Sequence, residues 1–241
     1  MCIRDRAYYQ RAGVELASRY VSQKLVERWS IEGTHQLENF VVESVGDESY
    51  AGTAGKLFEI VAMRKIAAGG KFQRRKVVDG VRDVIEFPTG LQQVYFNAGE
   101  LDRCFADTGV GAWYTPVSSR YPAVDAVLAC ISTGSSAPFP APANATISGR
   151  HNIILRAAKS KEGLASVVAA LNIGAKEEIP FLWLVPSKIF TSFTPGSFYD
   201  EGGRIKDDDV KDHSLAHRVV HYTVNIPLSP KEKAADGLGR D

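Results

Sequence analysis

The sequence predicts an α/β fold with a mixed central sheet and flanking helices, and two observations lead to this prediction. Apolar residues recur at helical spacing over residues 7–29 and 50–68, which predicts two amphipathic helices. Residues 181–185 form a continuous apolar run of the kind that a central, buried strand shows. Because helix and strand patterns alternate beyond residue 50, we expect layers of helix and sheet around one core.

The other elements follow from local patterns along the chain. A helix with one apolar face is expected over 163–173, and Gly69-Gly70 is expected to end the helix at 50–68. Segments rich in Gly, Pro, Ser or charge are expected to be irregular at 79–90, 132–142 and 202–212. Strands are expected at 71–78, 91–96, 113–116, 123–131, 146–147, 181–185 and 219–226.

Composition changes divide the chain into four parts. Residues 1–6 resemble a translated adapter rather than natural sequence, so the natural start is expected upstream and the chain is expected to be a piece of a longer protein. Residues 7–49 are expected to form the long helix and a connector. One domain is expected over 50–228, and residues 229–241 are a polar tail.

Several functional classes lack their signals in this sequence. The three cysteines, Cys2, Cys104 and Cys130, form no CxxC motif, which excludes a disulfide scaffold and a four-cysteine zinc site. No window approaches the roughly 20 apolar residues of a membrane span, so no membrane partner is expected. The G-x-S-x-G and G-x-G-x-x-G motifs are also absent, which removes the commonest hydrolase and dinucleotide-binding signals.

Three histidines have the spacing of metal ligands on a helix. His213, His217 and His221 stand at i, i+4 and i+8, so a helix would place them on one face. The β-branched residues of 219–226 favour a strand instead, which would separate the third ring from the other two. We therefore expect ordinary surface or partly buried histidines.

Positive charge is concentrated in one segment. The whole chain has 29 Lys and Arg against 28 Asp and Glu, a net charge of +1, whereas residues 56–78 hold seven basic residues and one acid, Glu59. Such a segment can neutralise nucleic-acid phosphates, and a solvated face balanced by Asp79, Asp83 and Glu86 is the equal alternative. The candidate phosphate contacts are Lys71, Arg74, Arg75 and Lys76.

Two acids stand in unusual surroundings. Glu59 lies inside the basic segment on an expected helix, and Asp125 interrupts an apolar strand. Metal-assisted phosphodiester cleavage needs carboxylates to hold the Mg²⁺ that generates the attacking hydroxide. Glu59 and Asp125 are therefore candidate metal ligands, with an acid at an exposed strand end as the alternative for Asp125.

These residues belong to an ordered set of motifs over about residues 50–226. The set resembles the C-terminal nuclease-like domain shared by Crinkler (CRN) effectors and retrotransposon hot spot (RHS) proteins of eukaryotic pathogens and parasites. Its pieces are Ala51-Gly-Thr-Ala-Gly-Lys-Leu-Phe-Glu59, Gly69-Gly-Lys-Phe72, Tyr121-Pro-Ala-Val-Asp125, Asn144-Ala-Thr146 followed by His151, and Phe181-Leu-Trp-Leu-Val-Pro186.

The resemblance implies a PD-(D/E)xK restriction-endonuclease core with a Mg²⁺ cofactor. It implies Glu59 as the helix glutamate, Asp125 as the metal-binding aspartate, Asn144 and Thr146 as the third motif, and His151 as a further nucleic-acid contact. The chain departs from the family at this third motif, because Asn144 is shorter than the usual Gln and Thr146 stands where many nucleases carry Lys. Lys159 or Lys161 could replace that lysine in space.

The resemblance leaves three functions open. The first is a nuclease-like effector domain that cleaves nucleic acid, DNA before RNA, with Mg²⁺. The second is a degenerate nuclease fold that binds DNA or a protein without cutting, which the departures at Asn144 and Thr146 favour. The third is a structural module that transmits the state of an upstream P-loop ATPase. A nuclear location, including a host nucleus after secretion, is implied with them.

Overall fold

The computed structural model describes residue 24 and residues 34–45, 51–118, 123–132, 138–156 and 163–228. Except for residue 24, the expected helix at 7–29 lies outside these residues, as do residues 1–6, the tail at 229–241, Lys159 and Lys161. The helices are α3 (Thr34–Ser44), α4 (Ala51–Ala67), α5 (Leu101–Thr108), α6 (Leu164–Ala170) and α7 (Ser187–Phe190), with 3-10 turns η1 (Gly109–Gly111), η2 (Asp207–Asp212) and η3 (Ala216–Arg218). No helix in these ranges is long and apolar enough to cross a membrane.

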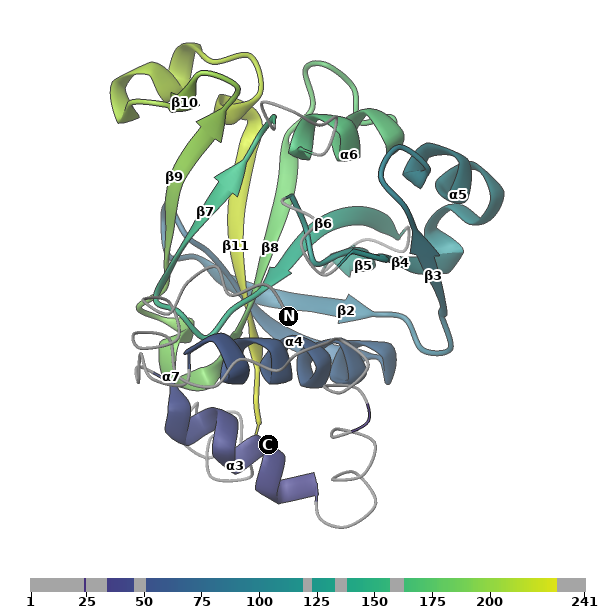
Figure 1. Cartoon of the computed structure of the whole chain (residues 1–241), viewed down its shortest axis with the longest axis vertical. Helices are drawn as coiled ribbons and strands as arrows, with labels where there is room; N and C mark the ends of the chain where they lie inside the picture. Colours follow the sequence, from purple (N-terminus) through teal and green to yellow (C-terminus); the bar gives the residue numbers. More distant parts are fainter. Residues whose placement is uncertain are drawn as a thin grey trace, which may run out of the picture.

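The described strands form two sheets (Figure 1). The strands are β1 (Gly70–Lys76), β2 (Arg82–Phe87), β3 (Gln92–Phe96), β4 (Ala112–Pro116), β5 (Ala126–Ser132), β6 (Phe139–Ala145), β7 (Arg150–Ile154), β8 (Ile179–Pro186), β9 (Thr194–Asp200), β10 (Gly203–Arg204) and β11 (Val219–Ile226). The larger sheet has the order β2-β1-β11-β8-β6-β5-β4-β3, and the smaller one the order β10-β9-β7. Parallel and antiparallel pairs occur together, so the mixed sheet with flanking helices is confirmed.

The larger sheet closes on itself. Beyond the linear order, β2 also pairs with β5, with Ile85 opposite Ser132 and Glu86 opposite Ile131. This pairing joins β1, β2, β5, β6, β8 and β11 into a closed six-strand barrel, which the sequence did not predict. Closure depends on side chains that meet across the barrel, and local sequence patterns do not predict which distant strands bring such side chains together.

The barrel wall separates two hydrophobic cores. On β8, Leu182 and Leu184 point inward, and Trp183 points outward, because successive strand residues face opposite sides. The inner core includes Leu57 and Phe58 of α4, which lies below β2 in the view of Figure 1. The outer core is covered by α6, the region of α7 and the smaller sheet. Burial of each large apolar side chain in these cores contributes roughly 1.5–3 kcal/mol to the free energy of folding.

All three segments expected to be irregular contain strand residues, and the segment 202–212 holds the short strand β10. The segment 79–90 holds β2, which follows a tight turn at Asp79-Gly80, where Asp79 Oδ1 accepts a hydrogen bond from the Val81 amide at 3.0 Å. The segment 132–142 holds most of β6, and the strand expected at 146–147 ends instead at Ala145. Pro140 and Pro142 are tolerated because β8 pairs with β6 only from residue 143 onward, so that part of β6 has a neighbour on one side.

Candidate functional site

Asp125 and Asn144 lie together where β5 and β6 meet. The Asp125 amide donates to the Ala143 carbonyl at 3.0 Å and to Asn144 Oδ1 at 2.8 Å, and the Ala145 amide donates to Asp125 Oδ2 at 2.9 Å. Each side chain thus accepts a hydrogen bond from the neighbouring strand's backbone at the point where the regular ladder ends. The structure brings these two sequence-predicted residues into one cluster.

Asn144 belongs to an outward-facing row that crosses the barrel. Asn144 is the register partner of Trp183, Trp183 of Thr223, and Thr223 of Arg75. Three strand spacings separate Asn144 from Arg75, a distance of about 14 Å. Arg75 therefore shares a face with Asn144 without belonging to its cluster.

His151 reaches this row from the smaller sheet. Its ring centroid lies 5.5 Å from that of Trp183, and its Nδ1 lies 3.0 Å from the Asn152 carbonyl. The Trp183 indole donates its Nε1 hydrogen to His221 Nδ1 at 3.2 Å. His151 is exposed and His221 is largely enclosed, so His151 is the accessible imidazole beside the row.

Thr146 is buried just after β6. Its amide donates to the Leu184 carbonyl at 3.0 Å, and its Oγ1 accepts a hydrogen bond from the Ser148 amide at 3.0 Å. Hydroxyl bonds of this local kind stabilise a turn. Thr146 thus directs the chain from β6 toward β7.

Glu59 is carried by an element on the other side of β6. It forms an ion pair with Lys56 at 3.2 Å, one turn earlier on α4. Helix α4 packs against the inward side of the barrel with Ala141 and Ala143, whereas Asn144 points outward. The second predicted acid is therefore not placed in the row that contains Asn144.

The cluster holds one of the two carboxylates that were expected at the Mg²⁺ site. Mg²⁺ prefers a near-octahedral shell of oxygens in which carboxylates supply the charge. The contacts place one carboxylate, Asp125, beside the neutral Asn144, and both accept backbone hydrogen bonds. Among the described residues, no group of three or more His, Cys, Asp or Glu side chains could hold a metal ion.

No protein-family model, curated protein or solved structure matches this sequence.

The four predicted phosphate contacts lie on two faces of β1. Arg74 points into the barrel, where it forms two bonds to the Asp83 carboxylate and lies 4.6 Å from the centre of the Tyr222 ring. Burial alone would lower the pKa of Arg74, but the hydrogen bond and charge of Asp83 outweigh it and raise that pKa. Lys76 lies 3.9 Å from Asp79, and exposed Lys71 and half-buried Arg75 belong to the outward face.

Arg82 is a basic residue that the sequence interpretation missed. It is the register partner of Arg75 on β2, and its guanidinium lies 5.8 Å from the centre of the Phe190 ring. The pKa of Arg75 is lowered, first by burial and then by the charge of Arg82. The Asp-Gly dipeptide at 79–80 followed by an alternating strand pattern is a hairpin signal that could have predicted this pair.

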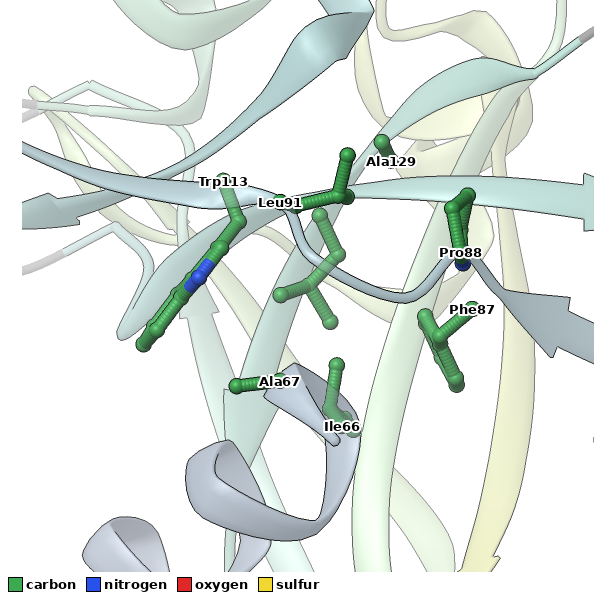
Figure 2. A pocket seen from close by; sticks show the side chains of 8 residues that line it. Ile66, Ala67, Phe87, Pro88, Leu91, Trp113 and Ala129 are labelled. Carbon is green, nitrogen blue, oxygen red and sulfur yellow. The ribbon is translucent and has the colours of Figure 1, made fainter. Parts of the chain in front are cut away.

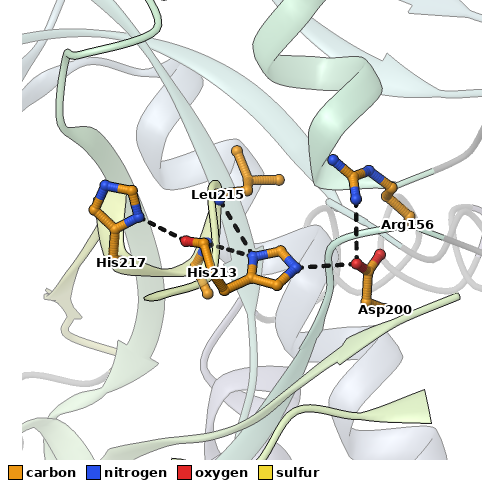
Figure 3. Close-up of polar contacts among 6 residues, drawn as sticks. Arg156, Asp200, His213, Leu215 and His217 are labelled. Atoms are coloured by element: carbon orange, nitrogen blue, oxygen red, sulfur yellow. Dashed lines mark hydrogen bonds and ion pairs between the residues drawn. The ribbon is translucent and has the colours of Figure 1, made fainter. Parts of the chain in front are cut away.

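A second polar cluster joins β9 to the chain before β11 (Figure 3). His213 Nε2 donates to Asp200 Oδ2 at 3.0 Å, and Arg156 binds the same oxygen at 3.2 Å. His213 Nδ1 accepts hydrogen bonds from the amides of Leu215 and Ala216 at 3.2 and 3.1 Å. Because both ring nitrogens are occupied by the protein, this histidine is a structural connector and has no position open to a substrate.

The three histidines do not share a face. His213 follows η2, His217 lies on η3 and His221 on β11, so the expected separation of the third ring is confirmed. The His217 Nδ1 hydrogen is donated to the His213 carbonyl at 2.6 Å (Figure 3).

A small pocket lies between the end of α4 and the sheet (Figure 2). Its volume is about 10 Å³, close to the minimum that one water molecule needs. Its lining is apolar and consists of Ile66, Ala67, Phe87, Pro88, Leu91, Trp113, Leu128 and Ala129. This pocket is a packing defect of the inner core, with neither the space nor the polar groups of a substrate site.

Proposed function

We propose that this chain is a nucleic-acid-binding domain related to the CRN and RHS nuclease-like domains, which binds its target, DNA before RNA, without cutting it. The proposal includes a diverged PD-(D/E)xK core, in which the adjacent strands β5 and β6 carry Asp125 and Asn144. It also includes the nuclear location and the upstream P-loop ATPase module that the resemblance implies.

One observation carries the non-cutting part of the proposal. Asp125 accepts a hydrogen bond from the Ala145 amide at 2.9 Å, and Asn144 accepts one from the Asp125 amide at 2.8 Å. Glu59 is carried by a helix on the opposite side of β6. A two-carboxylate centre needs both acids to share one ion, with their oxygens converging on it. A single carboxylate beside a neutral amide is a set suited to holding two strands together.

The test combines a binding assay with a cleavage assay on the full chain. We expect a fluorescent DNA duplex to bind at low salt and to dissociate as the salt concentration rises. The logarithm of the binding constant should fall with the logarithm of the salt concentration with a slope of about −0.9 for each phosphate contact. We expect no cleavage in the presence of Mg²⁺. Asp125→Asn is expected to bind DNA as tightly as the unaltered chain.

The matched control is Asp207→Asn, because Asp207 is an acid on η2 whose side chain is 84% exposed. Failure of the unaltered chain to bind any duplex or single strand would reject the proposal.

The second candidate is a Mg²⁺-dependent nuclease, favoured by one observation. Asp125 is a partly buried acid that adjoins Asn144 at a strand junction, which is where the resemblance implies the catalytic centre. Metal-dependent cleavage that Asp125→Asn abolishes and Asp207→Asn preserves would establish this candidate in place of the first.

A further inference from the structure

The outward face of the β1–β2 hairpin places two arginines directly opposite each other. Arg75 pairs with Arg82 in the antiparallel register, and the next outward pairs are Gln73 with Val84 and Lys71 with Glu86. Arg74 and Asp83 form the intervening pair, which points into the barrel. The outward face therefore carries three cations and one acid in these three pairs.

Neither arginine of the outward pair is neutralised by an acid within the described ranges. Arg75 donates to the carbonyls of Phe190 and Phe193 at 3.2 and 2.9 Å and to Thr223 Oγ1 at 3.3 Å. These acceptors are uncharged, so they orient the guanidinium and leave its charge in place. Arg82 is oriented by the Phe190 ring.

The other acids of the hairpin already have cationic neighbours. Asp83 binds Arg74 inside the barrel, Asp79 lies 3.9 Å from Lys76 at the turn, and Glu86 stands opposite Lys71. Like charges directly opposite in an antiparallel pair destabilise the sheet. An anion between Arg75 and Arg82 would remove that repulsion, and a guanidinium fork matches the geometry of a phosphate.

The arginine pair is also open to a large partner. Strand β2 pairs with β5 only at Ile85 and Glu86, so Arg82, at the start of β2, lies outside the strand pairing that closes the barrel. At the turn, Val78 and Val81 are 83% and 60% exposed. The start of β2 thus forms a projecting, positively charged ribbon rather than a closed pocket.

We propose that the outward face of the β1–β2 hairpin binds the phosphate backbone of a nucleic acid, with Arg75 and Arg82 holding one phosphate between them. This inference rests on the proposed function and assigns the contact surface to Arg82, Arg75 and Lys71, with Arg74 excluded because its guanidinium is used inside the barrel. Phosphate contacts of this type position the partner and do not read its sequence.

Arg82→Gln tests the surface with the least damage to the fold, since Arg75 also holds two backbone carbonyls. We expect its affinity for a DNA duplex to fall about tenfold at about 50 mM salt and its salt slope to lose about one unit. Arg82→Lys keeps the charge but loses the planar fork, so its affinity for the duplex is expected to lie between those of Arg82→Gln and the unaltered chain. The matched control is Arg103→Gln, an exposed arginine on α5, which is expected to bind like the unaltered chain.

Thermal melting of each variant separates loss of binding from loss of fold. Equal affinity of Arg82→Gln and the unaltered chain would overturn this surface while leaving the proposed function standing. Absence of duplex binding by the unaltered chain would reject both proposals. Binding to vesicles containing phosphatidylserine in place of DNA would show that the ribbon meets an anionic membrane, which also overturns the inference.

Discussion

Arg74 and Arg75 are neighbours in sequence, yet their guanidinium groups lie on opposite sides of the barrel wall. Arg74 is held inside by Asp83 and Tyr222, and Arg75 faces outward across from Arg82. The pleat of the strand alone produces this separation, because successive side chains alternate between faces. A run of basic residues on a strand therefore divides into two groups with different partners.

At the residue scale, we predict that Asp83→Asn destabilises the fold. The Arg74 side chain is 8% exposed, so replacing Asp83 removes the ion-pair partner of a buried cation. Removing one partner of a fully buried pair costs about 3–5 kcal/mol, and because Asp83 is 37% exposed we expect a loss of about 2 kcal/mol in the free energy of unfolding. Urea unfolding measures this quantity.

Two further variants check the cause. Arg74→Met in the Asp83→Asn background should recover most of the loss, since it removes the stranded charge. Asp207→Asn, which breaks the exposed pair with Arg204, should leave stability nearly unchanged. A stable Asp83→Asn variant would show that the Arg74 charge is compensated by another group.

At the element scale, the junction between α4 and β1 depends on a glycine. Gly69 has φ +73°, and a Cβ at this position would lie 2.5 Å from Thr89 Cγ2 and 3.0 Å from the Phe87 carbonyl oxygen. Its amide donates to the Ile66 carbonyl at 2.8 Å, which ends the helix. The left-handed conformation and the close approach of β2 both require the absence of a side chain.

We predict that Gly69→Ala costs more stability than Gly80→Ala, although the two glycines have nearly the same φ. Gly80 has φ +72° with nothing within 4 Å of a built Cβ, so its substitution should cost only the conformational penalty of about 1 kcal/mol. Gly69→Ala adds the steric conflict, and we expect a total of about 2–3 kcal/mol. Equal losses in chemical unfolding would mean that β2 moves away without cost.

The barrel also explains why the candidate site was only partly predictable. The Asp125 strand and the Asn144 motif were identified from their sequence, and the antiparallel pairing of β5 with β6 brings them together. The position of Glu59 was not predictable, because the side of the wall that α4 covers is fixed by inward-facing residues of strands distant in sequence. Arg82 was missed because 79–90 was expected to be a loop.

At the scale of the whole molecule, stability should fall between pH 6.5 and about pH 4. His221 packs among Phe181, Trp183 and Phe198, and burial lowers its pKa to about 4. The unfolded chain, in which the imidazole has its ordinary pKa near 6.5, binds the proton more readily over this interval. We expect a loss of roughly 3 kcal/mol from pH 7 to pH 4.

His221→Gln checks this prediction, because an amide oxygen can still accept the Trp183 hydrogen bond but does not titrate. Urea unfolding of this variant should show a flatter pH dependence, and His217→Gln, which alters an exposed imidazole, should resemble the unaltered chain. Asp200 affects the free energy of unfolding at lower pH than His221 does. Burial would raise its pKa, but bonding to His213 outweighs this and lowers it, so its stabilisation is lost only as the pH falls below about 4. If the free energy of unfolding of His221→Gln depended on pH as it does in the unaltered chain, the loss of stability would come from another titrating group.

Periodicity and turn residues are local signals, and they were enough to predict the α/β class, helix α4 with its glycine stop, the buried strand β8 and the last strand β11. Three features became visible only in the folded molecule: the sheet closes into a barrel, Arg74 and Arg75 lie on opposite sides of its wall, and Arg82 stands opposite Arg75. Each of these depends on strand register and on contacts between residues far apart in the chain. Local propensity carries no information about such contacts, since the free energy that fixes them comes from burial shared by several elements.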